Sequence, residues 1–404
     1  MKVVQINSVY KIASTGRTSF ELCSQLERYN HVAITACKNS SIDREHTIQI
    51  GNGFDYKIHA LLSRITGKPG YYSKRSTKKF LRELDQIKPD IVHLRNLHSN
   101  YINIPMLLKY LGEKDIATVI TLHDCFLFTG KCVHPILTGC TRYKNNCGKC
   151  KQIREGNKSW FFDRTQKMLN DKKLLFSNIS RLAVVGVSNW VTSQTNDSIL
   201  DPANIKTTIY NWIDESVFKP CLGIKEKFNS TVPIILGVAS HWEKSKGYDE
   251  FCEIASRMGD DIKVVLVGNV PDEKKVSNIY YVGEERNPHK LAELYSLATV
   301  FLNPTKMETF GKVSAEALAC GTPVVAYDVT ANKEIIGDKC GYIVEQGNMD
   351  KIVDAINCII TNGKDYYSSS CVQHVKKNFN MNSNVEKYME IYDKLIELKE
   401  EKNG

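Results

Sequence analysis

Residues 303–332 read NPTKMETFGKVSAEALACGTPVVAYDVTAN, and this stretch decides the fold of the chain. An apolar run ends at Asn303, Gly311 opens an alanine-rich segment, and Gly321 with Pro323 separates that segment from the apolar run VVAY. A left-handed glycine commonly ends a helix, and proline cannot continue one. The pattern therefore predicts a strand, a loop, a short helix and a second strand.

The turn at Gly311 predicts an anion site. A helix that begins there would point its unpaired N–H groups and the positive end of its dipole at the carboxyl ends of the strands, where a pyrophosphate is stabilised. Glu308 precedes this helix and Glu316 lies within it, and carboxylates accept hydrogen bonds from hydroxyl groups. A ligand with phosphates in the middle and hydroxyls at both ends, such as a sugar nucleotide, fits this arrangement.

The string from Glu308 to Glu316, followed by ALACGTPVVA, resembles the Glu-x7-Glu signature of the retaining glycosyltransferase family 4. The resemblance implies an α/β architecture, the GT-B fold, in which two Rossmann-like domains with parallel sheets face a central cleft. In that family the first glutamate lies beside the donor sugar and the second holds the ribose hydroxyls, which implies a catalytic Glu308 and a donor-binding Glu316. Phe310, Gly311 and Lys312 become donor-binding candidates with them. An ordinary strand–helix unit with two solvated glutamates is the alternative.

The composition is that of a two-domain globular protein. The chain has 404 residues, more than the roughly 250 to 300 at which a single core usually stops growing. Its start, MKVVQINSVY, shows no leader pattern, and no apolar run reaches the roughly 18 residues of a membrane span, so we expect a cytoplasmic protein. The net charge of +9 fits anionic substrates or an anionic membrane surface. It would also fit weak nucleic-acid binding, but we expect no nucleic-acid partner.

Apolar runs alternate with amphipathic segments along the whole chain, which predicts mostly parallel sheets covered by helices. The clearest runs are VVQIN (3–7), VAITA (32–36), DIVHL (90–94), TVITL (118–122), PIILGVA (233–239) and IKVVLVG (262–268). We assign residues 1–214 to an N-terminal acceptor domain and residues 215–380 to a C-terminal nucleotide-sugar donor domain. In the GT-B fold the last helix crosses back onto the first domain, so we expect residues 381–404 to pack there.

Two ligand-binding candidates follow strands of the first domain. Gly16 belongs to a region that comes close to the donor phosphates or the acceptor in the family, although a glycine before a helix is also simply a turn. His123 follows the predicted strand TVITL. A histidine at the matching place in the family contacts the donor sugar, which implies a catalytic role for His123, with a purely structural histidine as the alternative.

The second domain carries the candidates for phosphate binding. In the family an arginine and a lysine near its first turn grip the donor phosphates, and Lys246 matches the lysine. Ser240 stands where the arginine is usual, so we expect Lys244 to supply the missing charge. Gly283 ends a predicted strand, in a region whose backbone usually contacts the nucleotide base of the donor in the family. Without the glutamate signature, a surface lysine pair would explain Lys244 and Lys246 equally well.

Four cysteines lie close together in the sequence: Cys132, Cys140, Cys147 and Cys150. Two residues separate the last two, so both thiolates would reach one tetrahedral ion, and the first two would complete a structural zinc site. Disulfides and free thiols are the alternatives, and a reducing cytoplasm argues against disulfides. The run HDCFLFTGKC with a later Cys-x-x-Cys resembles a subset of the family that builds capsule, O-antigen and exopolysaccharide, including colanic acid type transferases.

Residues 71–87 predict a surface for an anionic membrane. They combine basic and aromatic residues, namely Lys74, Arg75, Lys78, Lys79, Arg82, Tyr71, Tyr72 and Phe80. In related enzymes with lipid-linked acceptors, such a surface rests on the inner membrane leaflet, where each basic residue adds about 1 kcal/mol. A solvated helix face is the alternative.

The resemblance implies a retaining enzyme that transfers a sugar from a nucleoside-diphosphate-sugar to a glycan, or lipid-linked glycan, acceptor in surface-polysaccharide biosynthesis. No Asp-x-Asp triplet occurs in the sequence. This agrees with a diphosphate stabilised by lysines and a helix N-terminus, so we expect no metal cofactor for catalysis. A sugar-nucleotide epimerase of the same architecture and a non-catalytic nucleotide-sugar-binding protein are the alternatives.

Overall fold

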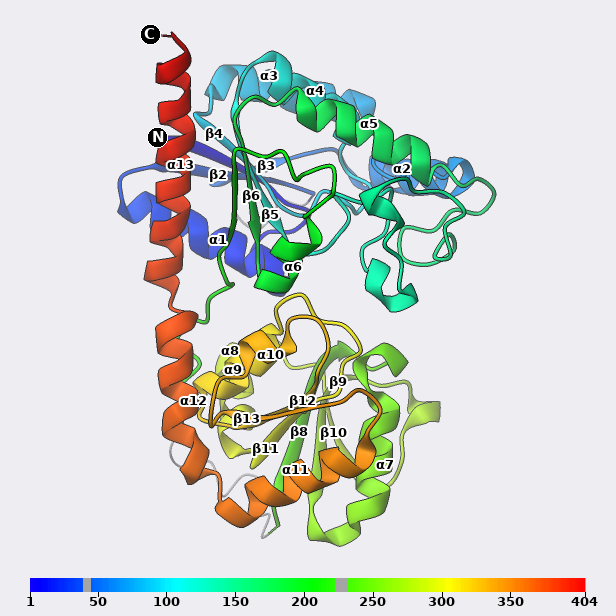
Figure 1. Cartoon of the computed structure of the whole chain (residues 1–404), viewed down its shortest axis with the longest axis vertical. Coiled ribbons are helices and arrows are strands. Elements are labelled where there is room, and N and C mark those ends of the chain that lie inside the picture. Colours follow the sequence, from blue (N-terminus) through cyan, green and yellow to red (C-terminus); the bar gives the residue numbers. More distant parts are fainter. Residues whose placement is uncertain (39–44, 222–231, 404) are drawn as a thin grey trace. The chain divides into compact units, whose positions relative to one another are not determined.

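The computed structural model describes residues 1–38, 45–221 and 232–403 (Figure 1). The chain divides into two compact units. Unit 1 consists of Met1–Ile209 and Asn382–Gly404, and unit 2 of Tyr210–Met381. Each unit is built on one sheet whose recorded strand pairs are all parallel. Among the described helices, none is long and apolar enough to cross a membrane.

Unit 1 contains a seven-stranded sheet in the order β3-β2-β1-β4-β5-β6-β7. The strands are β1 (Lys2–Ile6), β2 (Val32–Cys37), β3 (Thr47–Gln49), β4 (Ile91–Leu94), β5 (Ala117–Leu122), β6 (Leu182–Gly186) and β7 (Ile205–Thr208). The helices are α1 (Ala13–Arg28), α2 (Gly53–Thr66), α3 (Lys74–Ile87), α4 (Ile104–Glu113), α5 (Thr165–Ser177), α6 (Asn189–Gln194) and α13 (Met381–Asn403). The central strands β4, β5 and β6 are buried along their whole length, as expected for a parallel sheet covered on both faces.

Unit 2 contains a six-stranded sheet in the order β10-β9-β8-β11-β12-β13. The strands are β8 (Ile234–His241), β9 (Lys263–Asn269), β10 (Ile279–Gly283), β11 (Val300–Asn303), β12 (Val324–Tyr327) and β13 (Gly341–Val344). The helices are α7 (Tyr248–Met258), α8 (Pro288–Leu297), α9 (Lys312–Ala319), α10 (Asn332–Ile335), α11 (Met349–Asn362) and α12 (Asp365–Asn378). The strand, loop, helix and strand predicted from residues 303–332 are β11, α9 and β12 with the loop between them.

The strand orders define where each sheet accepts a ligand. The order of connection reverses between β1 and β4 in unit 1 and between β8 and β11 in unit 2. In open parallel sheets, ligands bind outside the carboxyl ends of the strands at such a reversal. We therefore expect ligand-binding residues in the loops that follow these four strands.

The helix α13 belongs to unit 1, although unit 2 precedes it in the chain (Figure 1, red). A buried polar network joins it to the sheet. His93 in β4 contacts Tyr392 through Nδ1 at 2.8 Å and Thr121 through Nε2 at 2.7 Å, and Thr121 contacts Tyr388 at 2.8 Å. Burial lowers the pKa of His93 well below its ordinary value, so the imidazole in this network is neutral.

Candidate functional site

Two loops of unit 2 meet at the reversal between β8 and β11. The backbone N–H of Lys306 donates to the carbonyl of Ser245 at 3.0 Å. Gly247, with φ +81°, lies against Pro304, where a Cβ atom would stand 2.4 Å from Pro304 Cγ. Only glycine fits this close, left-handed position, so the lysine turn after β8 is fixed against the loop after β11.

This packing brings Lys246 to Glu308. The ammonium Nζ lies 3.7 Å from Glu308 Oε2, with side chains 41% and 19% exposed. The backbone of Glu308 is held by Thr330, which accepts from the Glu308 N–H at 2.9 Å and donates to its carbonyl at 2.5 Å. A basic and an acidic side chain therefore stand together at the sheet reversal, both accessible to a ligand.

The N-terminus of α9 opens beside this pair. Gly311 has φ +86° and ψ 51°, a left-handed conformation that favours glycine, and it brings no side chain to cap the helix. The first turn of α9 contains no acidic residue. Asn303 at the end of β11 donates to Ser314 at 2.9 Å and fixes the direction of the helix. The helix N-terminus consequently retains backbone N–H donors suited to an anion.

The structure places the other candidates from this stretch in different surroundings. Glu316 is only 5% exposed and accepts a hydrogen bond from Tyr295 at 3.2 Å. Phe310 is 2% exposed and its ring packs against those of Tyr210 and Phe379, which makes it an anchor for the loop. Lys312 is half-buried at the first position of α9.

The remaining candidates of unit 2 lie in the lysine turn and at the end of β10. Lys244 is exposed, in the same short turn as Lys246. Ser240, which stands where the family usually has an arginine, lies in β8. Gly283 ends β10, two strands away from the reversal, in a left-handed conformation with φ +81° and open space where a Cβ would be.

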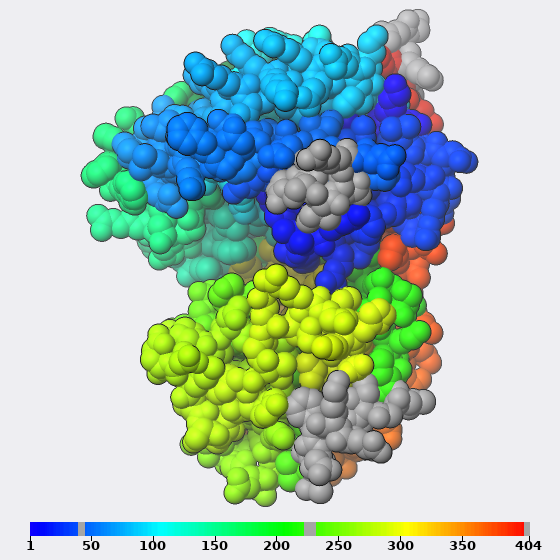
Figure 2. Space-filling view, turned by 180° about the vertical axis from the view of Figure 1, so that it is seen from behind, coloured from blue at the N-terminus to red at the C-terminus, as the bar shows by residue number. Residues whose placement is uncertain are grey.

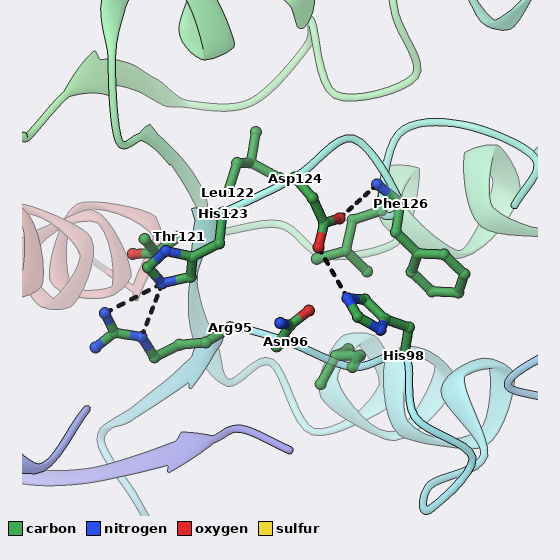
Figure 3. Close-up of a pocket in the computed structure, with 10 residues that line it drawn as sticks. Arg95, Asn96, His98, Thr121, Leu122, His123, Asp124 and Phe126 are labelled. Carbon is green, nitrogen blue, oxygen red and sulfur yellow. Dashed lines mark hydrogen bonds and ion pairs between the residues drawn. The ribbon is translucent and has the colours of Figure 1, made fainter. Parts of the chain in front are cut away.

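A second group of polar side chains gathers in unit 1, outside the carboxyl ends of β4 and β5 (Figure 3). Arg95 and His98 follow β4, and His123 and Asp124 follow β5. Two guanidinium nitrogens of Arg95 approach His123 Nε2, at 3.4 Å from Nε and 3.2 Å from Nη2. Sequence reasoning found His123 but missed Arg95 and His98. The signal was present, because RNLH directly follows the predicted strand DIVHL.

His98 and Asp124 form an ion pair in this pocket, with His98 Nε2 2.9 Å from Asp124 Oδ2. The other carboxylate oxygen accepts from the Phe126 N–H at 2.8 Å. Burial alone would lower the pKa of His98, but the charge and hydrogen bond of Asp124 outweigh it and raise that pKa. Burial alone would likewise raise the pKa of Asp124, but the charge and hydrogen bond of His98, with the Phe126 N–H, lower it. Each member of the pair therefore favours the charged form of the other.

Gly16 lies inside the first turns of α1 and serves the packing of its own loop. A Cβ at this position would stand 3.1 Å from Val9 Cγ2 and 3.2 Å from the Tyr10 nitrogen. The Gly16 carbonyl accepts from the Lys11 N–H at 3.0 Å. The small residue thus lets α1 approach the loop that follows β1.

All four clustered cysteines are free, half-buried thiols: Cys132, Cys140, Cys147 and Cys150. The sulfur atoms of Cys132 and Cys150 lie 3.8 Å apart, about the separation of two thiolates on one tetrahedral zinc with bonds of about 2.3 Å. In the part of the chain that the structure describes, however, no three His, Cys, Asp or Glu side chains are grouped to hold a metal. This arrangement does not form a complete zinc site, and the four-cysteine site stays a prediction.

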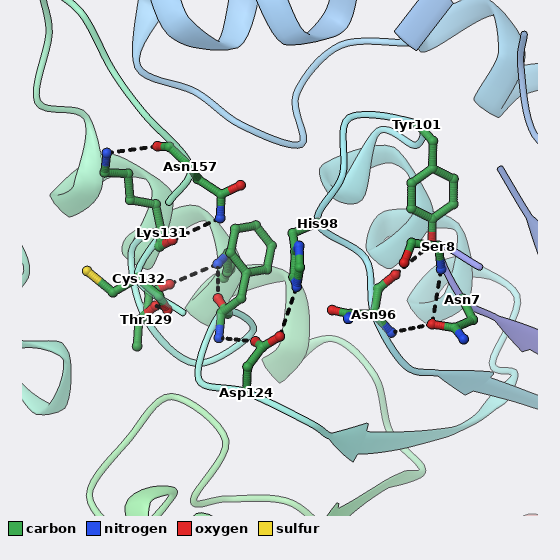
Figure 4. Close-up of polar contacts among 12 residues, drawn as sticks. Asn7, Ser8, Asn96, His98, Tyr101, Asp124, Thr129, Lys131, Cys132 and Asn157 are labelled. Carbon is green, nitrogen blue, oxygen red and sulfur yellow. Dashed lines mark hydrogen bonds and ion pairs between the residues drawn. The ribbon is translucent and has the colours of Figure 1, made fainter. Parts of the chain in front are cut away.

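Two buried lysines hold the cysteine-containing loop between β5 and α5. Lys131 donates to the carbonyls of Ile153 and Asn157 at 2.6 and 2.9 Å (Figure 4). Lys172 donates to the carbonyls of Phe126 and Thr129 at 2.6 and 2.8 Å. Ammonium groups satisfied by backbone carbonyls therefore stabilise this long irregular segment.

The membrane surface predicted at residues 71–87 is only half present. Its five basic residues are exposed, but its aromatic residues are not. Phe80 is buried in the core, Tyr71 donates to Asp171 at 2.9 Å, and the hydroxyl of Tyr72 contacts Thr66 at 2.5 Å. The structure thus excludes Phe80 from such a surface, whereas Tyr71 and Tyr72 are half-buried, and membrane contact by this segment stays a prediction.

Large apolar side chains are exposed on another part of unit 1. They come from α2 and from the loop before α5, and they are Phe54, Ile58, Leu61, Trp160, Phe161 and Phe162. The two segments touch, because the Trp160 N–H donates to the carbonyl of Arg64 at 2.7 Å. We call these six residues the aromatic patch; Figure 2 shows its helix in blue and its loop in green.

Comparison with known proteins adds a sequence relationship to this geometry. Residues 224–377 match the family described as Glycosyl transferases group 1. The chain is 26% identical over 208 residues to alpha-maltose-1-phosphate synthase of Mycolicibacterium smegmatis, covering 44% of this chain and 54% of the relative. It is 22% identical over 275 residues to the putative colanic acid biosynthesis glycosyl transferase WcaC of Escherichia coli, covering 66% of each. The matches thus span about half to two thirds of these relatives.

Solved structures resemble the whole chain. Sucrose-phosphate synthase from Thermosynechococcus elongatus aligns with a TM-score of 0.70 and 15% identity, covering 98% of this chain and 99% of the other. Anabaena Alr3699/HepE in complex with UDP-glucose aligns with a TM-score of 0.65 and 14% identity, covering 98% and 100%. These similarities confirm the predicted fold class. The chain has the GT-B fold of glycosyltransferases, and its second unit is related in sequence to the glycosyl transferases group 1 family.

Proposed function

We propose that this protein is a glycosyltransferase that moves a sugar from a nucleoside-diphosphate-sugar to a glycan acceptor in polysaccharide biosynthesis. The observation that carries the proposal is the pairing of Lys246 with Glu308 beside the open N-terminus of α9, at the sheet reversal of unit 2. The similarity of residues 224–377 to glycosyl transferases supports it. The relative named for colanic acid biosynthesis supports a surface polysaccharide as the product.

In the proposed reaction the diphosphate of the donor lies at the N-terminus of α9, and Lys246 stabilises the negative charge that develops as the sugar leaves. Glu308 accepts hydrogen bonds from the sugar hydroxyls and orients the ring. The bond between the anomeric carbon and the diphosphate oxygen breaks, and a bond to the acceptor hydroxyl oxygen forms. The nucleoside diphosphate leaves without a bound metal and takes up the proton of that hydroxyl, and the sugar keeps its anomeric configuration. A solved structure of the same fold contains UDP-glucose, so we propose a UDP-sugar as the first donor to test.

The experiment is a transfer assay combined with a binding assay. Wild-type protein is screened with UDP-, GDP- and ADP-sugars for a rise in melting temperature, since a ligand that prefers the folded state stabilises it. Glu308→Gln is expected to keep the shift but to lose at least about 100-fold in transfer rate, whereas Lys246→Met is expected to weaken both. Lys351→Met, at an exposed lysine of α11 that is no donor-binding candidate, is the control and is expected to leave both unchanged.

The outcomes separate the alternatives. Conversion of the donor sugar without any acceptor would identify an epimerase. Donor binding without turnover by the wild type, over a panel of glycan acceptors, would identify a non-catalytic binding protein. If no nucleotide sugar shifts the melting temperature, the proposed donor site is wrong.

We also propose that the acceptor is lipid-linked and that the aromatic patch meets an anionic membrane. Phe161 is 71% exposed, and the patch is accompanied by exposed basic residues on the same two segments, Lys57, Arg64, Lys158 and Arg164. Aromatic rings with neighbouring cations suit the interface between headgroups and acyl chains. Arg164 lies 5.2 Å from the Phe162 ring, so cation and ring already form one surface.

Flotation with liposomes tests this contact. Wild-type protein is expected to float with vesicles that contain anionic lipid and not with neutral vesicles. Trp160→Ser with Phe161→Ser should lose this binding, whereas Leu174→Ser, at another exposed apolar position, should retain it. Equal flotation of the patch variant would refute the surface while leaving the transfer reaction untouched.

A further inference from the structure

Arg95 is a cation held in the interior of unit 1. The residue is 2% exposed and directly follows β4. Its Nη1 donates to Gln5 Oε1 at 2.8 Å, and its Nη2 donates to Thr18 Oγ1 at 3.2 Å. Both partners are neutral, and no residue within the described ranges forms an ion pair with Arg95. A buried charge without a counter-ion costs free energy, so its retention points to a role beyond packing.

The contact between Arg95 and His123 fixes the chemistry of the imidazole. Nε and Nη2 of the guanidinium converge on one atom, His123 Nε2 (Figure 3). A guanidinium has five N–H donors and no acceptor, and it stays protonated in proteins. The lone pair of Nε2 must therefore accept, and a ring that accepts at Nε2 is neutral and carries its proton on Nδ1.

We propose that Arg95 is a positioning residue that holds His123 as the neutral tautomer protonated on Nδ1. Gln5 in β1 and Thr18 in α1 hold the guanidinium from the opposite side, so its orientation is set by two elements outside the loop of His123. In this contact the arginine donates to the histidine at Nε2, and the ring proton is therefore left on Nδ1.

His98 shows the opposite arrangement in the same pocket. Its Nε2 lies 2.9 Å from a carboxylate oxygen of Asp124, an acceptor that requires the proton on that nitrogen. The two histidines follow neighbouring strands, yet one meets a donor and the other an acceptor through the same ring atom. Pairs of like groups held in different states are typical of sites where each has its own task.

The proposal makes a statement about substrate recognition that rests on the proposed function. With its proton on Nδ1, any hydrogen bond that the His123 ring makes to a ligand is donated to an acceptor oxygen, such as that of a sugar hydroxyl or a phosphate. It does not remove a proton through Nε2, because that lone pair is already occupied by Arg95. His123 is thus a binding and orienting group, and proton transfer falls to another group.

Nitrogen NMR tests the tautomer without any substrate. Full-length protein is labelled with ¹⁵N-histidine, and the ring signals of His123 are identified by their loss in His123→Gln. We expect the proton on Nδ1 in the wild type. In Arg95→Met we expect the proton to move at least partly to Nε2, while Arg286→Met, which changes an exposed arginine of unit 2, leaves the signals unchanged.

Two results would overturn the proposal: a wild-type His123 protonated on Nε2, or an unchanged tautomer in a folded Arg95→Met protein. If Arg95→Met does not fold, the wild-type spectrum still decides. The variant Arg95→Lys, which keeps the charge but not the paired donors, then takes the place of Arg95→Met.

Kinetics give an independent readout. Arg95→Met and His123→Gln should each lower kcat/KM at least tenfold, and the double variant should be no slower than His123→Gln alone. Additive losses would contradict the coupling, whereas failure of all transfer would concern the proposed function only.

Discussion

Gly311 shows how a single residue shapes the site of unit 2. It holds a left-handed backbone at the start of α9, with Glu308 Cγ only 3.3 Å from the place where a Cβ would be. The same residue therefore sets the direction of the helix N-terminus and the position of the acidic side chain. Sequence reasoning predicted this turn correctly because glycine, proline and the apolar runs are local signals.

We expect Gly311→Ala to cost about 1 to 2 kcal/mol of folding free energy, since a left-handed conformation is strained for any residue with a Cβ. Donor affinity should fall more than stability, because the new methyl group pushes on Glu308. Thermal unfolding and a donor titration measure the two effects. Gly363→Ala is the control, with positive φ but open space around it. A donor affinity equal to that of the control would contradict this role.

Asp124→Asn addresses the ion pair with His98. The raised pKa of His98 contributes stability below its ordinary value of about 6.5, and this is lost as pH rises through the folded pKa. The lowered pKa of Asp124 contributes stability that is lost as pH falls through its own folded value. The variant should therefore be less stable by about 3 kcal/mol near pH 5 to 6, with a smaller gap at higher pH. Melting curves at several pH values, with Asp163→Asn as the comparison, measure the gap. A gap that does not vary with pH would refute the pairing.

The residues that sequence reasoning placed less well are those whose surroundings come from distant elements. Phe310 belongs to the family signature, but the rings of Tyr210 and Phe379 bury it. Tyr71 finds its partner a hundred positions away, in Asp171. Motif spacing indicates which residues lie near a turn, whereas their exposure depends on packing that one stretch of sequence does not contain.

At the scale of elements, the loop between β5 and α5 is the least regular segment of unit 1. Two 3-10 turns are its only helical pieces in the described structure. Its cysteines suggested a metal, and the structure adds two buried ammonium groups, those of Lys131 and Lys172, that bind backbone carbonyls of the loop. A buried lysine cannot be predicted from the sequence pattern, because most lysines are exposed.

Lys172→Met should destabilise this loop by about 1 to 3 kcal/mol, because the carbonyls of Phe126 and Thr129 would lose their donor inside the protein. Lys173→Met, at the exposed neighbouring position, should have little effect. Hydrogen exchange of residues 125–164 and thermal unfolding report the difference. Equal behaviour of the two variants would show that the ammonium group does not hold the loop.

The zinc prediction is tested by metal analysis of protein purified under reducing conditions. A bound ion would require Cys140 and Cys147 to turn toward the Cys132–Cys150 pair, giving about one zinc per chain. Cys147→Ser should then lose the metal, and Cys358→Ser, an exposed cysteine of unit 2, should keep it. Metal-free protein with native stability would refute the zinc site.

At the scale of the molecule, the chain forms two sheets with the same kind of reversal, and each reversal collects the polar residues of its unit. The alternation of apolar runs predicted this architecture, because buried parallel strands appear as short continuous runs of valine, isoleucine and leucine. The short strand β3 has no such signal, since TIQ is only partly buried. Its place at the sheet edge follows from pairing with β2.

Removal of residues 382–404 should unfold unit 1 selectively. Without α13, His93 and Thr121 would lose their tyrosine partners, and the apolar surface beneath the helix would be exposed to water. Hydrogen exchange should show loss of protection in β4 and β5 but not in β8 and β11. A shorter truncation of residues 401–404 is the control. Retained protection in β4 after the longer deletion would show that the helix is dispensable.

The position of α13 in the chain also has a consequence for biosynthesis. A ribosome makes the seven strands of unit 1 first, then all of unit 2, and only then the helix that closes the first sheet. During that interval the nascent chain exposes the buried face of β4 and β5, while the second sheet is free to complete its own assembly. We therefore expect chaperones to bind unit 1 for longer than unit 2, although most of unit 1 leaves the ribosomal exit tunnel first.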